Sequence, residues 1–236
     1  SALLALHLPT TLAGRGADLG TGYGYLSAEL LQRSRGITAL DVFEADPEDA
    51  AVLISGEGER GLCAGGDIRM IYDGGKAGSQ EPVDFWREEY RMNARLRRLE
   101  KPYIAFMDGI VMGGGVGVSV YGSHRIVTER TRFAMPETGI GFFPDVGASW
   151  FLTRQQNELG TYAALTGEQL AAGDAIVLGL ADSYIPSDRL PALAETLSHL
   201  PASASRADVS ATIAAFADPP PPAQMAAQQP LIDRLF

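Results

Sequence analysis

Short apolar runs alternate with glycine-rich turns along the first half of the chain. Residues 37–43, 51–55 and 102–107 are strand-like runs, and each is closely followed by Asp, Pro or Gly. In residues 1–12 the leucines recur at helical spacing, which predicts a helix, and residues 25–33 also have a helical pattern. Strands that alternate with helical segments in this way predict an α/β fold.

Glycines mark a loop and a helix start in the middle of the chain. The segment 73–82 contains three glycines and is predicted to be a mobile loop. It precedes a charged amphipathic helix at 85–100. A glycine triplet should open another helix at 112–121, because glycine lets the backbone approach a ligand while the free amides of a helix start point outward.

The second half of the chain is predicted to contain short strands followed mainly by helices. The elements expected there are strands at 126–128 and 132–134, a loop at 138–146, helices over most of 148–200 and a helix at 207–217. The prolines at 219–222 cannot continue a helix, so they predict an extended spacer.

Composition narrows the class of protein. The chain has 236 residues, of which 46% are hydrophobic and 20% charged, and this balance is typical of a folded globular protein and excludes disorder over most of its length. Its net charge of −10 would repel phosphate backbones and anionic lipid. Neither nucleic acid nor a membrane surface is therefore an expected partner.

The number of cysteines and the hydropathy of the chain indicate in which cellular compartment the protein is expected. The single cysteine, Cys63, can form neither an internal disulfide nor a cysteine zinc site, so a reducing compartment is expected and the cytoplasm is predicted. No apolar run approaches the roughly 18–20 residues of a membrane helix. Residues 1–8 are apolar but short and carry no basic leader, so we expect them to be neither a span nor a secretion signal.

The N-terminal segment carries a nucleoside-binding pattern. Asp18, Gly20, Gly22 and Gly24 lie between a predicted strand and a helix, and Glu44 lies twenty residues further on, where an acid can bind ribose hydroxyls. Residues 1–46 resemble the start of class I methyltransferases that use S-adenosylmethionine, in particular those acting on ribosomal RNA. The other interpretation is that these residues only form a Rossmann-like β-α-β packing unit.

A second resemblance begins near residue 43 and covers the rest of the chain. The stretches at 43–47, 61–68, 112–115 and 133–138 read FEADP, GLCAGGDI, MGGG and FAMPET. In this order they resemble the crotonase (enoyl-CoA hydratase/isomerase) superfamily, which implies a spiral of ββα turns with C-terminal helices. Within it, the sequences FWREEY and FPDVG resemble the 3-hydroxyisobutyryl-CoA hydrolase branch, which cleaves an acyl-CoA thioester in valine breakdown.

The two resemblances predict an organisation in three parts. Residues 1–46 form the methyltransferase-like fragment in place of the usual first crotonase turn, 47–200 the crotonase core, and 201–236 a partial helical region with the proline spacer. The N-terminal fragment cannot bury enough apolar area alone. We expect it to dock through the strand at 37–43 beside the strand at 51–55, as part of a chain that is a junction or a fragment.

The crotonase resemblance implies the catalytic chemistry. Gly66 and Gly114 match the two positions whose backbone amides stabilise the negative charge that develops on a thioester carbonyl oxygen. Glu137 falls on the principal catalytic carboxylate and is expected to be the nucleophile or general base, with Asp145 as an orienting acid. Glu89 matches a glutamate of the hydrolase branch that lines the substrate pocket, although on a charged helix it could equally face solvent.

Residue 117 distinguishes hydrolysis from the other reactions of the superfamily. Hydratases of the superfamily use a second glutamate just after the glycine triplet, and that position here is Gly117, which favours hydrolysis over hydration. The alternatives kept are an enoyl-CoA hydratase or isomerase, a methyltransferase fragment and an inactive chimera. Cys63 and the three histidines, His7, His124 and His199, are interpreted as structural. Neither a metal nor an organic cofactor is expected, CoA being part of the substrate, and a homo-oligomer is possible.

Overall fold

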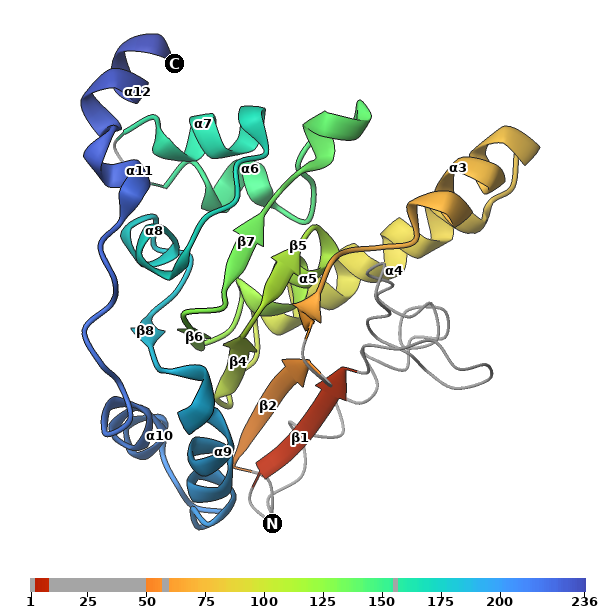
Figure 1. Ribbon diagram of the computed structural model, residues 1–236. Coiled ribbons are helices and arrows are strands. Elements are labelled where there is room, and N and C mark those ends of the chain that lie inside the picture. The colour runs from red at the N-terminus through yellow and green to blue at the C-terminus, as the bar shows by residue number, and fades with distance from the viewer. Residues whose placement is uncertain (1–2, 9–49, 57–59, 155–156) are drawn as a thin grey trace.

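The structure is a computed structural model that describes residues 3–8, 50–56, 60–154 and 157–236. Its strands form two parallel sheets (Figure 1). The five-stranded sheet has the order β1-β2-β4-β6-β8, with β1 at Leu3–Leu8, β2 at Ala51–Gly56, β4 at Tyr103–Met107, β6 at His124–Val127 and β8 at Ser183–Tyr184. The three-stranded sheet has the order β3-β5-β7, with β3 at Gly61–Cys63, β5 at Ile110–Met112 and β7 at Arg132–Ala134.

The chain alternates between the two sheets. Each of β2, β4 and β6 is followed by one strand of the smaller sheet, and β3 and β5 are in turn followed by helices. These helices are α3 at Ile68–Ala77, α4 at Glu81–Leu96 and α5 at Gly114–Ser119. The repeat of strand, strand and helix is the ββα turn expected from the sequence.

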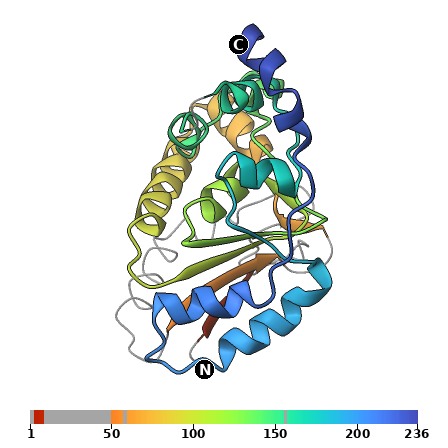
Figure 2. The same cartoon turned by 90° about the vertical axis from the view of Figure 1, so that its left-hand side faces the viewer.

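The C-terminal half is mainly helical, as predicted. Its elements are the short 3-10 helices η1 at Glu137–Ile140 and η2 at Ser187–Arg189, and the helices α6 at Ala148–Phe151, α7 at Leu159–Thr166, α8 at Ala172–Val177, α9 at Leu190–Ser198, α10 at Arg206–Ala214, α11 at Gln224–Ala227 and α12 at Gln229–Leu235. Figure 2 shows α9 and α10 lying against the five-stranded sheet. The proline spacer packs on α8, where a Cβ atom on Gly173 would lie 2.3 Å from the carbonyl oxygen of Pro221.

The central strands of the larger sheet are buried on both faces. Successive residues alternate in direction, so Val52 and Ile54 of β2 join the core toward the smaller sheet and the helices around it. Ala51 and Leu53 of the same strand pack in a second core with α9 and α10. This explains why the run 51–55 is apolar at nearly every position, which is typical of buried parallel strands.

Three expectations about the chain's first part and its glycine loop are corrected. Residues 3–8 form β1, which pairs with β2 from Leu3 with Ala51 to Leu8 with Gly56, so the helix predicted at 1–12 is wrong. The neighbours of β2 are β1 and β4, so the predicted pairing of 37–43 with 51–55 is also wrong. The segment 73–82 is largely helical rather than a loop, because Gly78, at a φ of 66°, ends α3 and α4 starts at Glu81.

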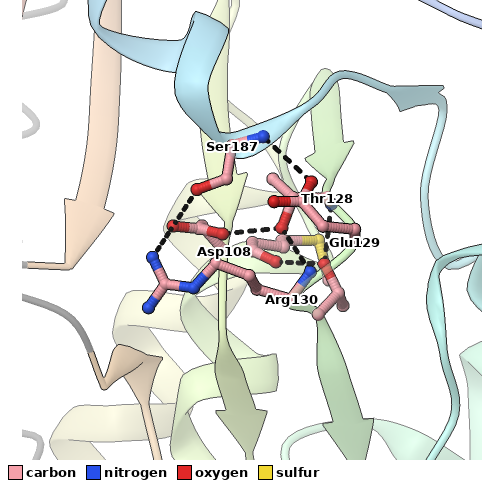
Figure 3. Close-up of polar contacts among 7 residues, drawn as sticks. Asp108, Thr128, Glu129, Arg130 and Ser187 are labelled. Carbon is pink, nitrogen blue, oxygen red and sulfur yellow. Dashed lines mark hydrogen bonds and ion pairs between the residues drawn. The ribbon is translucent and has the colours of Figure 1, made fainter.

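A polar network ties together the turns that precede β5 and β7 (Figure 3). Asp108 accepts hydrogen bonds from Thr128 Oγ1 at 2.6 Å, from Arg130 at 3.0 Å and from Ser187 Oγ at 3.1 Å. The amide of Ser187 also donates to Glu129 Oε2 at 3.0 Å. Because Asp108 lies just before β5 and Arg130 just before β7, the network fixes one end of both strands.

Candidate active site

The three strands of the smaller sheet end at one common edge. Because β3, β5 and β7 are parallel, their carboxyl ends lie together, and this edge is where α/β sheets usually bind ligands. The chain continues from β3 to Gly66, from β5 to Gly114 and from β7 to Glu137. Segments far apart in the sequence thereby deliver three of the predicted site residues to one place.

The two glycine segments pack backbone against backbone. Gly65 and Gly113 have φ values of 115° and 51°, which favour glycine, and a Cβ atom on Gly113 would lie 3.4 Å from the Cα of Gly65. Gly114 is the first residue of α5, so its amide has no acceptor within the helix. The contact between Gly65 and Gly113 brings the neighbouring residues Gly66 and Gly114 close together.

All five predicted site residues line one cavity of about 360 Å³. Its wall combines the glycine segments, the carboxylates and a largely apolar surface. The lining residues are Ala64, Gly65, Gly66, Ile68, Ile71, Tyr72, Phe85, Trp86, Glu89, Gly113, Gly114, Pro136, Glu137, Ile140, Gly141, Phe142 and Asp145. The rings of Trp86 and Phe142 stack with their centroids 5.7 Å apart. Apolar walls with a few convergent polar groups are typical of a small-molecule site.

Glu89 points into the protein, although α4 is a charged helix. Its side chain is only 3% exposed, and a Cβ atom on Gly114 would lie 2.7 Å from its Oε1 atom. Burial, followed by the charges of Asp145 and Glu137, raises the pKa of Glu89 to about 8. The interpretation of Glu89 as a solvent-facing residue is therefore wrong, and at neutral pH its carboxyl group is mostly protonated.

Glu137 is the first residue of η1 and is also buried. A Cβ atom on Gly113 would lie 3.1 Å from its Oε1 atom, so glycine is needed there for the carboxylate to approach. Its Oε2 atom has no hydrogen-bond partner among the described residues. Burial, followed by the charge of Asp145, raises the pKa of Glu137 to about 7. Glu137 therefore lines the cavity with a raised pKa and with one carboxyl oxygen that has no partner among the described residues.

Asp145 reaches the same cavity from the loop before α6. Its Oδ2 atom accepts a hydrogen bond from the hydroxyl of Tyr90 at 2.8 Å, and burial raises its pKa. Val146, the next residue, has a φ of 43°, which is unusual for a β-branched residue, and its carbonyl oxygen accepts a hydrogen bond from Tyr121. Both hydrogen bonds fix the backbone and side chain of this loop relative to the helices.

Sequence reasoning did not identify Tyr90 or Trp86 as site residues. Both belong to the motif FWREEY, which was used for the family resemblance but of which only Glu89 was assigned a role. Helical spacing could have found Trp86, because it lies three residues before Glu89 on the same face of α4. Tyr90 had no such signal, since its partner, Asp145, is 55 residues away.

The position of the second hydratase glutamate is closely packed. A Cβ atom on Gly117 would lie 2.9 Å from Asn93 Nδ2 and 3.0 Å from Val146 Cγ1. No side chain can be added there without displacing its neighbours, and Gly117 does not line the cavity. The site therefore contains the carboxylates of Glu89, Glu137 and Asp145 and lacks one at residue 117.

Cys63 and His124, which we interpret from the sequence as structural, take no part in the cavity. Cys63 is buried, and burial raises the pKa of its thiol to about 12, so it is not a thiolate. His124 makes hydrogen bonds to Ser123 and Ser210. Within the described residues no group of His, Cys, Asp and Glu is arranged to hold a metal ion. Nor does the described part of the chain contain a helix that could cross a membrane.

Comparison with known proteins places this geometry in a family. The profile of the enoyl-CoA hydratase/isomerase family matches residues 30–236. The chain belongs to the enoyl-CoA hydratase/isomerase family. Its fold is also that of a solved structure, a carnitinyl-CoA dehydratase from Mycobacterium thermoresistibile, with a TM-score of 0.83, 44% identity and coverage of 90% of this chain and 60% of that one. The crotonase-like α/β fold predicted from the sequence is thus confirmed.

Curated relatives in this family are hydrolases. The chain is 49% identical over 158 residues to the mitochondrial 3-hydroxyisobutyryl-CoA hydrolase of Xenopus tropicalis, covering 67% of this chain and 41% of the relative. It is 44% identical over 202 residues to the enzyme of the same name from Danio rerio, covering 84% and 53%. The chain therefore spans about half the length of the curated relatives it matches.

The comparisons also correct two interpretations of the sequence. The relatives are named as mitochondrial enzymes, which contradicts the predicted cytoplasmic location. The family match begins at residue 30, inside the segment 1–46 that resembles a methyltransferase, and these relatives give no support to that resemblance. Residues Asp18, Gly20, Gly22 and Glu44 lie outside the described residues, so a nucleoside site there stays a prediction.

Proposed function

We propose that this protein is an acyl-CoA thioester hydrolase that acts on 3-hydroxyisobutyryl-CoA, a reaction of valine breakdown. The observation that carries the proposal is the meeting of Gly66, Gly114 and Glu137 at one sheet edge, with Glu89 and Asp145 in the same cavity. The curated relatives named as 3-hydroxyisobutyryl-CoA hydrolases support the choice of substrate.

In the proposed reaction the amides of Gly66 and Gly114 bind the carbonyl oxygen of the thioester. Attack on the carbonyl carbon moves negative charge onto this oxygen, and two preset donors stabilise it more than they stabilise the neutral carbonyl. Removing one such donor typically costs about 10²–10³ in turnover. The backbone geometry of the two glycine segments therefore supplies the largest stabilising effect in this mechanism.

Glu137 is the proposed nucleophile or general base. In its ionised form it either attacks the carbonyl carbon itself or removes a proton from a water molecule that attacks. If Glu137 attacks, the carbon–sulfur bond breaks to release CoA and a mixed anhydride forms on Glu137, which water then hydrolyses to the product acid and free Glu137. If water attacks, the same bond breaks and the oxygen of water enters the product acid directly. In both cases the sulfur of CoA takes a proton. Asp145, held by Tyr90, is proposed to orient the substrate or pass the proton to the leaving sulfur.

Glu89 is proposed to bind substrate as a neutral acid. With a pKa raised to about 8, it keeps its proton at neutral pH and can donate a hydrogen bond. A neutral group beside Gly114 also avoids placing a second negative charge next to the oxyanion. We propose that the reaction uses no metal and no cofactor beyond the CoA of the substrate, and that nucleic acid is not a partner.

The second candidate is hydration or isomerisation of an enoyl-CoA. The family match favours it, and so does a solved relative named as an enoyl-CoA hydratase from Rhodobacter sphaeroides. That structure is 38% identical with a TM-score of 0.78, and the match covers 89% of this chain and 58% of that chain. The close packing around Gly117 disfavours it, because water addition in this superfamily uses a glutamate at that position.

One assay separates the two candidates. Release of free CoA from 3-hydroxyisobutyryl-CoA is measured as new thiol, and hydration of an unsaturated acyl-CoA is measured in parallel on the same folded protein. Hydrolysis without hydration is expected. Hydration without thiol release would replace the proposal with the second candidate, and neither activity in the folded chain would refute both for this chain.

A further inference from the structure

The catalytic cavity carries charged groups of one sign only. Glu89, Glu137 and Asp145 line it, and no Lys, Arg or His is among the described residues that form its wall. The ion pairs that the structure shows in the described part of the chain involve none of these three residues. The cavity therefore offers negative charge to a ligand and no positive side chain to balance it.

Two of the three carboxyl groups also lack hydrogen-bond partners. Within the described residues Glu137 Oε2 has none, and the structure shows none for the carboxyl group of Glu89, whose side chain is 3% exposed. Buried polar groups in folded proteins usually have a partner, and lacking one costs free energy. Because both side chains line the cavity, a group of a bound ligand can supply the partner that Glu89 lacks.

These carboxyl groups flank the backbone at which the proposed reaction holds the thioester carbonyl. A Cβ atom on Gly113 would lie 3.1 Å from Glu137 Oε1, and one on Gly114 would lie 2.7 Å from Glu89 Oε1. In an acyl group whose carbonyl oxygen accepts from the amide of Gly114, the next carbon atoms lie beside these carboxyl groups. A polar substituent on the third carbon of a short acyl chain therefore lies among the acidic side chains.

We propose that the cavity selects acyl groups by charge and that the protein also hydrolyses 3-aminoacyl-CoA thioesters. The ammonium group takes the place of the substrate hydroxyl and donates hydrogen bonds to Asp145 and Glu89. An ammonium group has three donors and no acceptor, so it suits carboxylates that have no cation of the protein beside them. A carboxylate on the acyl group would instead add a like charge, and such substrates are excluded.

This substrate class rests on the proposed function, because the same thioester bond is broken. The carbon–sulfur bond breaks, the oxygen of water enters the product acid, CoA leaves as the thiol, and the ammonium group stays in the product. A cation beside the three carboxyl groups favours their ionised forms, and the ionised form of Glu137 is the reactive one. The amine therefore assists the proposed step as well as binding.

The test compares thiol release from 3-aminopropionyl-CoA, 3-hydroxypropionyl-CoA and malonyl-CoA at neutral pH, where an aliphatic amine is protonated. KM for the amine should be about tenfold lower than KM for the hydroxy compound, as expected for a hydrogen bond between charged groups. For malonyl-CoA, kcat/KM should be about a hundredfold lower or less. A KM for the amine equal to or above that for the hydroxy compound would overturn the proposal.

Asp145→Asn tests the origin of the preference. The ratio of the two KM values should return to about one, and a loss of rate common to both substrates does not change this ratio. Asp84→Asn is the matched control, because it makes the same change on an exposed residue of α4 that does not line the cavity, and it should keep the wild-type ratio. An equal change of the ratio in both variants would contradict selection within the cavity.

Binding separates this inference from the proposed function. Ketone analogues of the amino and hydroxy substrates, with a methylene group between sulfur and carbonyl, cannot be hydrolysed. In calorimetric titrations the amino analogue should bind about tenfold more tightly to the wild type, and both analogues should bind equally to Asp145→Asn. This preference in a protein without thiol release would refute the proposed function and leave charge selection in place, whereas thiol release without the preference would refute charge selection alone.

Discussion

The hydroxyl of Tyr90 donates a hydrogen bond of 2.8 Å to Oδ2 of Asp145, and this contact joins α4 to the loop before α6. It holds a half-buried carboxylate that lines the catalytic cavity. The position of Asp145 thus depends on a residue of another element, 55 positions earlier in the chain.

Tyr90→Phe should lower kcat for thioester hydrolysis about tenfold. The loss of one hydrogen bond to a charged group typically costs about 1.5–3 kcal/mol, and orientation of Asp145 is what the bond supplies. Steady-state kinetics of the variant test this, with Tyr162→Phe on α7 as a control that should behave as wild type. Unchanged kcat in Tyr90→Phe would show that Asp145 needs no such support.

The two carboxylates should differ in how much activity their loss removes. Glu137→Gln should lower kcat by several powers of ten, because it removes the nucleophile or base, whereas Asp145→Asn should cost less or change the preference among acyl groups. The measurement is thiol release from several acyl-CoA substrates. Wild-type turnover in Glu137→Gln would refute the assignment of this residue.

Hydrolysis should increase with pH through neutrality. Because the pKa of Glu137 is raised to about 7 and its ionised form is the reactive one, kcat/KM should rise as pH passes through about 7. The apparent value belongs jointly to Glu137, Glu89 and Asp145, since these carboxylates interact. A profile that is already flat between pH 5 and pH 8 would contradict an ionised Glu137 with a raised pKa.

Glu89→Gln should make the folded state less sensitive to pH. The folded-state pKa of Glu89, about 8, lies above its ordinary value of 4.5, so the folded protein holds this proton more tightly than the unfolded chain. The free energy of unfolding should therefore fall as pH rises from about 5 to 8, by an amount on the order of a few kcal/mol. Urea unfolding at several pH values should show a smaller fall in the variant, and an equal fall in both proteins would contradict the prediction.

Gly117→Glu should destabilise the protein without creating a hydratase. The new side chain would begin 2.9 Å from Asn93 and 3.0 Å from Val146, and overpacking of this kind typically costs about 1–3 kcal/mol. Thermal unfolding and an enoyl-CoA hydration assay check the two parts. Gly75→Glu in α3, where nothing lies within 4 Å of an added Cβ atom, serves as the matched comparison for stability. A stable Gly117→Glu variant that hydrates enoyl-CoA would show that the position lacks only a carboxylate.

The sequence predicted which residues meet in the catalytic cavity better than it predicted what surrounds them. The resemblance to crotonases assigned Gly66, Gly114 and Glu137 to one site. The structure gives the physical reason, because each residue follows a strand of one parallel sheet and parallel strands bring their carboxyl ends to one edge. The unpartnered amide of Asn93 could not be predicted from the sequence, because the hydrogen-bond partners of a buried group depend on the packing of α4 against Gly117. A sequence motif can identify the residues that follow a strand. Whether a buried polar group finds a hydrogen-bond partner depends on tertiary packing, which a motif does not predict.

The errors have similar physical causes. The leucines of residues 1–12 have helical spacing, but pairing with β2 along six residues overrides that local preference. The glycines of 73–82 suggested a loop, yet Gly74 and Gly75 lie inside α3, and Gly78 ends the helix. The lone Cys63 indicates a reducing compartment. It does not single out the cytoplasm, since thiols remain reduced in more than one compartment.

A conventional alanine scan cannot measure what the two glycine segments contribute to the proposed catalysis. The hydrogen-bond donors at Gly66 and Gly114 are main-chain groups, so replacing a side chain leaves both N–H groups in the chain. Alanine at residue 114 would act instead by pressing a methyl group on the carboxyl of Glu89, which lies 2.7 Å from where that methyl would be. Chemical synthesis with an ester in place of one of these peptide bonds removes a single donor and keeps the outline of the cavity, and this substitution isolates what the backbone contributes.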